Sequence, residues 1–151
     1  MQTKIIRTAT PEDLIAAAKI FRDAIRTADW LPPASRQLTD FAAVSVDEDV
    51  FVCCDDANVV QGLVSVWRPE AFIHHLYVDS RFRNQGVGSL LLASLENWLP
   101  RPWTLKCANA NHAAMGFYRS RGWRAIRVDE NEHGPYTVLE FAPSASALAT
   151  Q

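Results

Sequence analysis

The sequence predicts one mixed α/β domain, with a central mixed sheet that carries helices on its faces. Two observations support this fold class. Strand-like and helix-like segments alternate through the second half of the chain, as they do in sheets covered by helices. The chain has 151 residues, of which 48% are apolar, enough for one ordinary domain with a hydrophobic core. We expect this domain to cover residues 1–142 and residues 143–151, which lack an apolar period, to form a flexible tail.

The first half of the chain contains a short strand and two helices. A strand over residues 4–7 precedes a helix over residues 11–27, which Thr10 can cap and which has proline at its first position. The proline-containing segment 30–33 must end this helix. A second, weaker helix is expected over residues 35–46. In the first helix, apolar residues three or four positions apart predict one buried stripe: Leu14, Ala17, Ala18, Phe21 and Ile25.

Two segments in the middle of the chain predict a hairpin, because they are rich in β-branched and aromatic residues and flank a polar turn. They cover residues 50–54 and 59–67, around Asp55–Asn58. Strands and helices then alternate, and Gly122 is placed to end the second of these helices. The remaining expected elements are strand 71–78, helix 86–99, strand 103–108, helix 111–121 and strands 123–128 and 136–141.

Charge and cysteine usage exclude several classes of protein. A formal net charge of −2 gives no broad electrostatic reason to expect nucleic acid or an anionic membrane as a partner. No run reaches the roughly 18 to 20 apolar residues that span a bilayer, and the N-terminus lacks the apolar stretch of a secretory signal. We therefore expect a cytoplasmic protein. Cys53, Cys54 and Cys107 lack C-x-x-C spacing and lie in apolar segments, so we expect buried, reduced thiols and no metal site.

The segment Arg81–Ser89 joins a predicted strand to a predicted helix and combines basic residues with two glycines. Gly86 and Gly88 keep side chains away from the backbone N–H groups at the helix start, where an anion is favoured. Arg81 and Arg83 add positive charge, so we expect a diphosphate ligand. The alternative is a tight turn with solvated arginines. The chain has no Gly-Lys pair for a P-loop, and it lacks the third small residue of a dinucleotide fingerprint.

Two spaced motifs follow one another in this half of the chain. The first is R-x-x-G-x-G, present as Arg83–Gly88 after the strand unit Leu76–Val78. The second is N-x-x-A-x-x-x-Y-x-x-x-G-[FW], present at Asn111, Ala114, Tyr118, Gly122 and Trp123. In their order and spacing, these motifs resemble the GCN5-related N-acetyltransferases, the GNAT superfamily. The resemblance covers residues 60–128 well and the first 50 residues only by the order of elements.

The resemblance implies a fold and a co-substrate. The implied GNAT fold has a central, mostly antiparallel, twisted sheet with a V-shaped splay between strands 4 and 5 and helices on both faces. The pantetheine arm of acetyl-coenzyme A (acetyl-CoA) would lie in this splay, held by main-chain groups of Leu76, Tyr77 and Val78 and by Asn111. Its diphosphate would be held by main-chain amides next to Arg83, namely those of Asn84, Gln85, Gly86, Val87, Gly88 and Ser89.

The resemblance also implies a general acid, but it leaves the base open. Tyr118 would protonate the leaving thiolate, whereas without its motif it would be expected to be a tyrosine packed on the sheet. Many ribosomal-protein acetyltransferases have a glutamate where Lys106 stands, so that base cannot be transferred. We prefer His74, because arylalkylamine acetyltransferases have a histidine at this place and imidazole accepts protons near neutral pH. Strand alternation predicts that His74 and His75 lie on opposite faces. His75, Glu70 and a water chain are the alternatives.

The function implied by the resemblance is transfer of an acetyl group from acetyl-CoA to a primary amine, by direct attack in a ternary complex, in a monomer or homodimer. Trp30, Leu31 and Pro33 stand where the family builds its acceptor pocket, with core packing as the alternative. The identity of the acceptor stays open, as does the choice of acetyl over other short acyl groups. Rival functions are a non-catalytic acetyl-CoA sensor or protein-binding module of the same fold, and nucleotide binding at the glycine loop.

Overall fold

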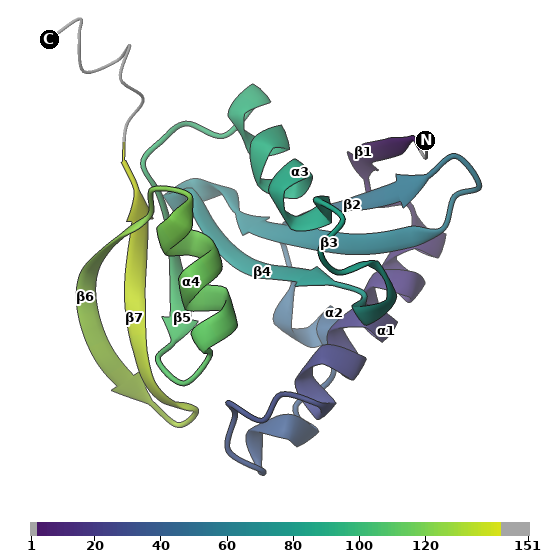
Figure 1. Cartoon of the computed structure of the whole chain (residues 1–151). Coiled ribbons are helices and arrows are strands. Elements are labelled where there is room, and N and C mark those ends of the chain that lie inside the picture. Colours follow the sequence, from purple (N-terminus) through teal and green to yellow (C-terminus); the bar gives the residue numbers. More distant parts are fainter. Residues whose placement is uncertain (1–2, 143–151) are drawn as a thin grey trace, which may run out of the picture.

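The strands of the computed structural model, which describes residues 3–142, form one seven-stranded sheet (Figure 1). Its order is β1-β2-β3-β4-β5-β7-β6, and each neighbouring pair is antiparallel except β4 with β5, which is parallel. This confirms the mixed, mostly antiparallel sheet that we expected. The tail expected at residues 143–151 lies outside the described residues. The strands are β1 (Lys4–Thr8), β2 (Asp49–Asp55), β3 (Val60–Trp67), β4 (Phe72–Val78), β5 (Trp103–Ala108), β6 (Arg124–Asn131) and β7 (Gly134–Phe141).

Helices pack against both faces of the sheet, as predicted (Figure 1). The buried cluster under α1 and α2 includes Phe21, Phe41 and Leu63. The cluster under α3 and α4 includes Leu91 and Trp103. None of the helices within residues 3–142 combines the length and the apolar composition needed to cross a lipid bilayer. The helices are α1 (Pro11–Arg26), α2 (Phe41–Val44), α3 (Val87–Ser94) and α4 (His112–Ser120).

Asp13 determines how α1 begins and which of its residues are buried. Its carboxylate accepts a hydrogen bond from the Thr10 amide at 3.0 Å, and its own amide donates to the Thr10 hydroxyl at 3.1 Å, which completes a capping box. Arg7 on β1 donates two more hydrogen bonds to this carboxylate, at 2.9 and 3.0 Å. Asp13 is therefore buried, and Leu14, which we predicted to lie in the buried stripe, is 39% exposed.

The prediction of one helix over residues 35–46 is wrong. The chain forms a 3-10 turn, Ser35–Gln37, and then the short helix α2. Asp40 separates them, because its backbone is extended and its side chain accepts a hydrogen bond from the amide three residues later, which caps a new helix. Phe41 then packs on Phe21 of α1, with the ring centroids 5.3 Å apart, so α2 is held against α1.

Two further elements differ in length from their predictions. α3 ends at Ser94, and a 3-10 turn, Leu95–Asn97, takes the place of its expected last turn. The final hairpin is longer than expected, because β6 continues to Asn131 and β7 already begins at Gly134. The three cysteines are buried and free, as predicted.

Candidate active site

A groove opens where β4 and β5 diverge. Within the described chain, the two strands share a single pair, Phe72 with Thr104, whereas β5 pairs with β7 along its whole length. Beyond Phe72, the edge of β4 that faces β5 has no partner strand among residues 3–142. This confirms the splay predicted between strands 4 and 5. A cavity of about 1130 Å³ is lined by the end of β4, the loop that follows it, α3, α4 and the end of α1.

Most of the predicted site residues line this one groove, although they come from segments far apart in the chain. Two predicted residues do not line it. Gln85 is exposed at the tip of the loop, and His74 lies further back along β4. The predicted residues that line the groove are Leu76, Tyr77, Val78, Arg83, Asn84, Gly86, Val87, Gly88, Ser89, Asn111 and Tyr118.

The loop between β4 and α3 presents backbone N–H groups to the groove. Asn84 and Gly86 have positive φ angles of 62° and 80°, a conformation that favours glycine or asparagine. Gly86 is the N-cap of α3, and no side chain caps this helix end. The amides of the first turn, from Val87 on, therefore lack helical partners and are available to an anion.

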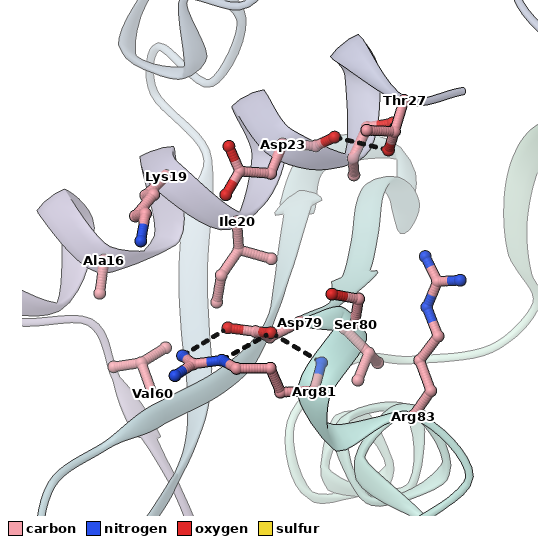
Figure 2. Close-up of a pocket in the computed structure, with 12 residues that line it drawn as sticks. Ala16, Lys19, Ile20, Asp23, Thr27, Val60, Asp79, Ser80, Arg81 and Arg83 are labelled. Atoms are coloured by element: carbon pink, nitrogen blue, oxygen red, sulfur yellow. Dashed lines mark hydrogen bonds and ion pairs between the residues drawn. The ribbon is translucent and has the colours of Figure 1, made fainter. Parts of the chain in front are cut away.

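The two predicted arginines of this loop point to different places. The Arg81 guanidinium donates to the Asp79 carboxylate at 2.9 and 3.2 Å, and this contact holds the pKa of Asp79 below its usual range. Figure 2 shows Arg81 in a second cavity, of about 410 Å³, between α1 and the loop, with Lys19 on the facing helix. Arg83 lines both cavities. Arg83 is therefore the one of the two whose charge lies at the groove.

Asn111 and Tyr118 are the motif residues on α4. The Asn111 side chain caps this helix by accepting a hydrogen bond from the Ala114 backbone amide at 3.2 Å. Tyr118 is buried, with its ring edge-on to Phe117 and Trp123 at centroid distances of 5.2 and 5.5 Å. Burial raises the pKa of Tyr118 well above its usual range. The phenol therefore keeps its proton at neutral pH and can serve as a proton donor.

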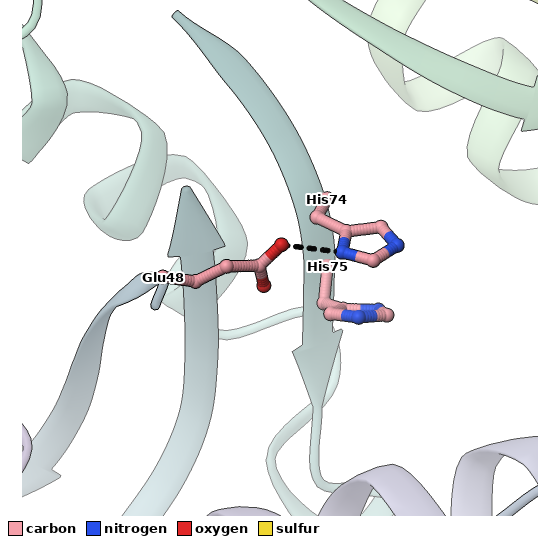
Figure 3. Close-up of side chains that lie close together, drawn as sticks. All are labelled: Glu48, His74 and His75. Atoms are coloured by element: carbon pink, nitrogen blue, oxygen red, sulfur yellow. Dashed lines mark hydrogen bonds and ion pairs between the residues drawn. The ribbon is translucent and has the colours of Figure 1, made fainter. Parts of the chain in front are cut away.

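His74 and His75 are not on opposite faces, so that prediction is wrong. The pairing of β3 with β4 jumps from Ser65–His75 to Val66–Ile73, which leaves His74 as the extra residue of a β-bulge. The two imidazole rings stack, with centroids 3.9 Å apart (Figure 3). A bulge places two consecutive side chains against one residue of the partner strand, which is why simple alternation fails here.

The bulge brings His74 to a carboxylate. The His74 Nδ1 atom lies 2.6 Å from the Glu48 Oε2 atom, and the Glu48 side chain, which comes from the segment before β2, is only 7% exposed (Figure 3). The sequence analysis missed Glu48. The His74 side chain is 38% exposed, so its ring remains accessible.

The structure disfavours two of the alternatives to His74 as the base. Burial and the neighbouring His74 lower the pKa of His75 to about 3, so His75 cannot take up a proton near neutral pH. Glu70 is exposed in a 3-10 turn before β4, on the far side of the Phe72–Thr104 pair. Of the two imidazoles on β4, His74 is therefore the accessible one.

One cluster of possible metal ligands occurs within residues 3–142, formed by Glu48, His74 and His75, whose ligand atoms all lie within 4.8 Å of one another. The two imidazole planes are only 28° apart and stacked. Lone pairs in stacked rings point along nearly parallel planes and do not converge on a tetrahedral ion. The arrangement is better suited to a proton transfer than to a metal.

The connection between α1 and α2 is joined directly to the turn between β6 and β7. The Ser35 hydroxyl, in the α1–α2 connection, lies 2.7 Å from the Nδ1 atom of His133, in the β6–β7 turn. Trp30, in the same connection, is half-buried, packs against the α1 cluster and lines the groove. Trp30 therefore packs on the core, and its place in an acceptor pocket stays a prediction.

The comparison with known families decides the classification. A model of the acetyltransferase (GNAT) family matches residues 15–123, which is more than half of the chain. This chain belongs to the GNAT family.

Solved GNAT structures superpose on nearly the whole chain, although sequence identity is low. The apo form of YjaB from Escherichia coli gives a TM-score of 0.78 at 19% identity, covering 94% of this chain and 99% of that protein. The ribosomal-protein-S18-alanine N-acetyltransferase of the same organism gives 0.70 at 18%, covering 94% and 95%. The structure of yncA from Salmonella typhimurium with its cofactor acetyl-CoA gives 0.66 at 17%, covering 95% and 99%. No curated protein matches the sequence.

The sequence analysis missed two residues that line this groove next to the β4–α3 loop. Arg121 donates to the Ser89 hydroxyl at 2.8 and 3.2 Å, and its guanidinium lies 3.7 Å from the centroid of the Phe117 ring. Both Arg121 and Phe117 line the groove, so Arg121 is a second arginine beside Arg83 in its lining. A signal was present, because an aromatic residue followed four positions later by arginine shares one face of a helix.

Proposed function

We propose that this GNAT domain transfers the acetyl group of acetyl-CoA directly to a primary amine within a ternary complex. The observation that carries the proposal is the content of a single groove: an unpaired strand edge, an uncapped helix start and the buried Tyr118. The family, together with a similar structure that contains acetyl-CoA, supports this co-substrate.

In this proposal, the two ends of the groove bind different parts of the co-substrate. The amides of residues 84–89 hold the diphosphate, with positive charge from Arg83 and Arg121. The free edge at Leu76–Val78 offers main-chain groups to the pantetheine amides, as a neighbouring strand would. The Asn111 side chain lies along the same path. An amide of this edge directed at the acetyl oxygen stabilises the negative charge that forms there during attack.

The chemistry that we assign needs three proton transfers. The ammonium acceptor first gives one proton to His74. The amine nitrogen then forms a bond to the acetyl carbon, the carbon–sulfur bond breaks, and Tyr118 gives its proton to the leaving thiolate. The second proton, which the nitrogen loses as the amide forms, restores the Tyr118 phenol. The products are the acetylated amine, free coenzyme A and the proton held by His74, so atoms and charges balance. Burial keeps the phenol protonated, and the same burial would make a thiolate that forms beside it more basic than it is in water, which favours the transfer.

The proposal is tested by measuring thiol release from acetyl-CoA with a panel of primary amines. We expect Tyr118→Phe to lower kcat about 100-fold or more, the usual contribution of a general acid, with the Kd of acetyl-CoA unchanged. Tyr136→Phe is the matched control, because Tyr136 does not line the groove. Equal rates for Tyr118→Phe and wild type at every pH would remove Tyr118 from this role.

The same assay separates the proposal from its rivals. Acetyl-CoA that binds tightly while no amine releases thiol would indicate a sensor of the same fold. Saturation by ATP but not by coenzyme A would indicate a nucleotide site. If titration with acetyl-CoA gives neither heat nor a thermal shift, the proposed function is wrong.

A further inference from the structure

The buried carboxylate of Glu48 has no role in the chemistry assigned so far. Its Oε2 atom contacts His74, whereas its Oε1 atom is buried without a hydrogen-bond partner among the described residues. Burying a carboxylate this deeply is unfavourable unless a partner compensates for the lost water. His74 is that partner, at 2.6 Å.

The contact fixes which nitrogen of His74 carries the hydrogen. A carboxylate only accepts hydrogen bonds, so the Nδ1 atom of His74 must be the donor. A neutral imidazole has one N–H, and the Nε2 atom is then left with its lone pair. Figure 3 shows Nε2 at the end of the ring that points away from Glu48. The nitrogen that can accept a proton is thus directed away from the buried carboxylate.

His74 lies on the same strand as the groove residues Leu76–Val78, although its own side chain does not line the groove. His74 follows the last β4–β5 pair, Phe72–Thr104, by two positions and precedes the groove residue Leu76 by two. A regular strand would turn the His74 side chain to the face opposite His75. The extra residue of the bulge instead stacks it on His75, whose buried ring supports it from one side.

We propose that Glu48 is a positioning residue, which holds His74 as the Nδ1–H tautomer and orients its Nε2 atom to take the proton of the acceptor ammonium. This inference rests on the proposed function. When the proton moves to Nε2, the imidazole becomes positively charged beside the Glu48 carboxylate, which stabilises that charge. The exposed part of the ring then passes the proton to water.

The first test is made on the wild-type protein. Nitrogen NMR of the histidine rings, recorded at alkaline pH where an ordinary imidazole is neutral, distinguishes the two tautomers. We expect His74 to be mainly the Nδ1–H form. A predominant Nε2–H form would overturn the inference, whatever the activity of any variant.

The second test uses Glu48→Gln, with Asp49→Asn as the matched control. Asp49 is the next residue, carries the same charge and pairs with Arg68 at the surface instead of with a histidine. We expect Glu48→Gln to lower kcat about 10- to 100-fold, less than loss of the base itself, with unchanged Kd for acetyl-CoA. Asp49→Asn should have wild-type kinetics. Thermal unfolding of both variants verifies that each is folded, and Glu48→Asp, which keeps the carboxylate, should recover part of the rate.

A double variant separates positioning from a general structural role. If Glu48 acts through His74, then adding Glu48→Gln to His74→Gln should cost no further activity. An equal loss in both backgrounds, or wild-type kinetics for Glu48→Gln, would overturn the inference and leave the proposed function intact. A wild-type protein that neither binds acetyl-CoA nor releases thiol would overturn the proposed function itself.

Discussion

Gly62 on β3 lies under the groove, and replacing it with alanine tests how tightly this part of the core is packed. A Cβ atom at this position would lie 2.8 Å from the Cγ1 atom of Val87 and 3.0 Å from the main-chain oxygen of Tyr77. The first distance is shorter than Cβ atoms tolerate, and the second is tighter than most Cβ contacts. The β-branched Val87 side chain is buried and stiff, and the Tyr77 oxygen belongs to the neighbouring strand, so neither can move without displacing other atoms.

The expected loss of stability follows from two opposing terms. Inserting a methyl group into a packed core costs about 1–3 kcal/mol. Alanine also lowers the entropy of the unfolded chain, which returns about 0.4–1 kcal/mol. The net destabilisation should be about 1–2 kcal/mol, or a fall in Tm of about 3–8 °C for a domain of this size.

The matched control is Gly116→Ala on α4, where the added Cβ would have no atom within 4 Å. This position is exposed in a helix, so alanine should raise the stability by about 0.5–1 kcal/mol. Urea unfolding followed by circular dichroism gives both free energies. The packing argument is refuted if Gly62→Ala unfolds at the wild-type midpoint while Gly116→Ala shows its expected gain.

Two further changes address the groove and the pH dependence. Gly88→Ala places a methyl group at the start of α3, 3.3 Å from the Phe117 ring. In calorimetry, this change should raise the Kd of acetyl-CoA about 10-fold, and the stability of the fold should not fall. Unchanged affinity would mean that phosphate does not bind at this helix start. Asp13→Asn should destabilise the fold by about 1–2 kcal/mol at pH 7, because it weakens the capping box and the Arg7 contact. The hydrogen bonds from Arg7 lower the pKa of Asp13 in the folded protein. The ionised Asp13 carboxylate therefore stabilises the fold fully above about pH 4, the pKa of aspartate in an unfolded chain. This contribution is lost as the pH falls through the lowered pKa of the folded protein. Unfolding at several pH values should show the gap between variant and wild type closing in acid, and a constant gap would contradict this assignment.

The parts of the site that depend on the backbone could be predicted from sequence. The spacing of Arg83, Gly86 and Gly88 after a strand indicates an uncapped helix start, and the structure has one. The sequence predicts a helix over residues 111–121, and α4 forms there with Asn111 as its cap. These features are local, because each depends on residues within one turn or one loop.

The parts that depend on distant residues could not be predicted. The bulge at His74 is a property of the pairing between β3 and β4, and the alternation of side chains along β4 contains no sign of it. Glu48 lies in an acidic stretch that is expected to be a solvated loop, and only the fold brings it to His74. Leu14 fits the apolar period of α1, but the Arg7 contact from another element buries Asp13 in its place.

The sheet comes close to being two separate sheets, since the Phe72–Thr104 pair is the only ladder contact between β1–β4 and β5–β7 in residues 3–142. That pair can act as a hinge for the two halves. A ligand that is hydrogen-bonded to the main chain on one or both sides of the opening would fix the distance between the two halves of the sheet. Since such a ligand binds the folded form alone, it would add about 2.7 kcal/mol at a hundredfold excess over its Kd. Amide hydrogens along the free β4 edge would then exchange more slowly with solvent. The thermal stability of this protein would therefore depend on the concentration of its co-substrate.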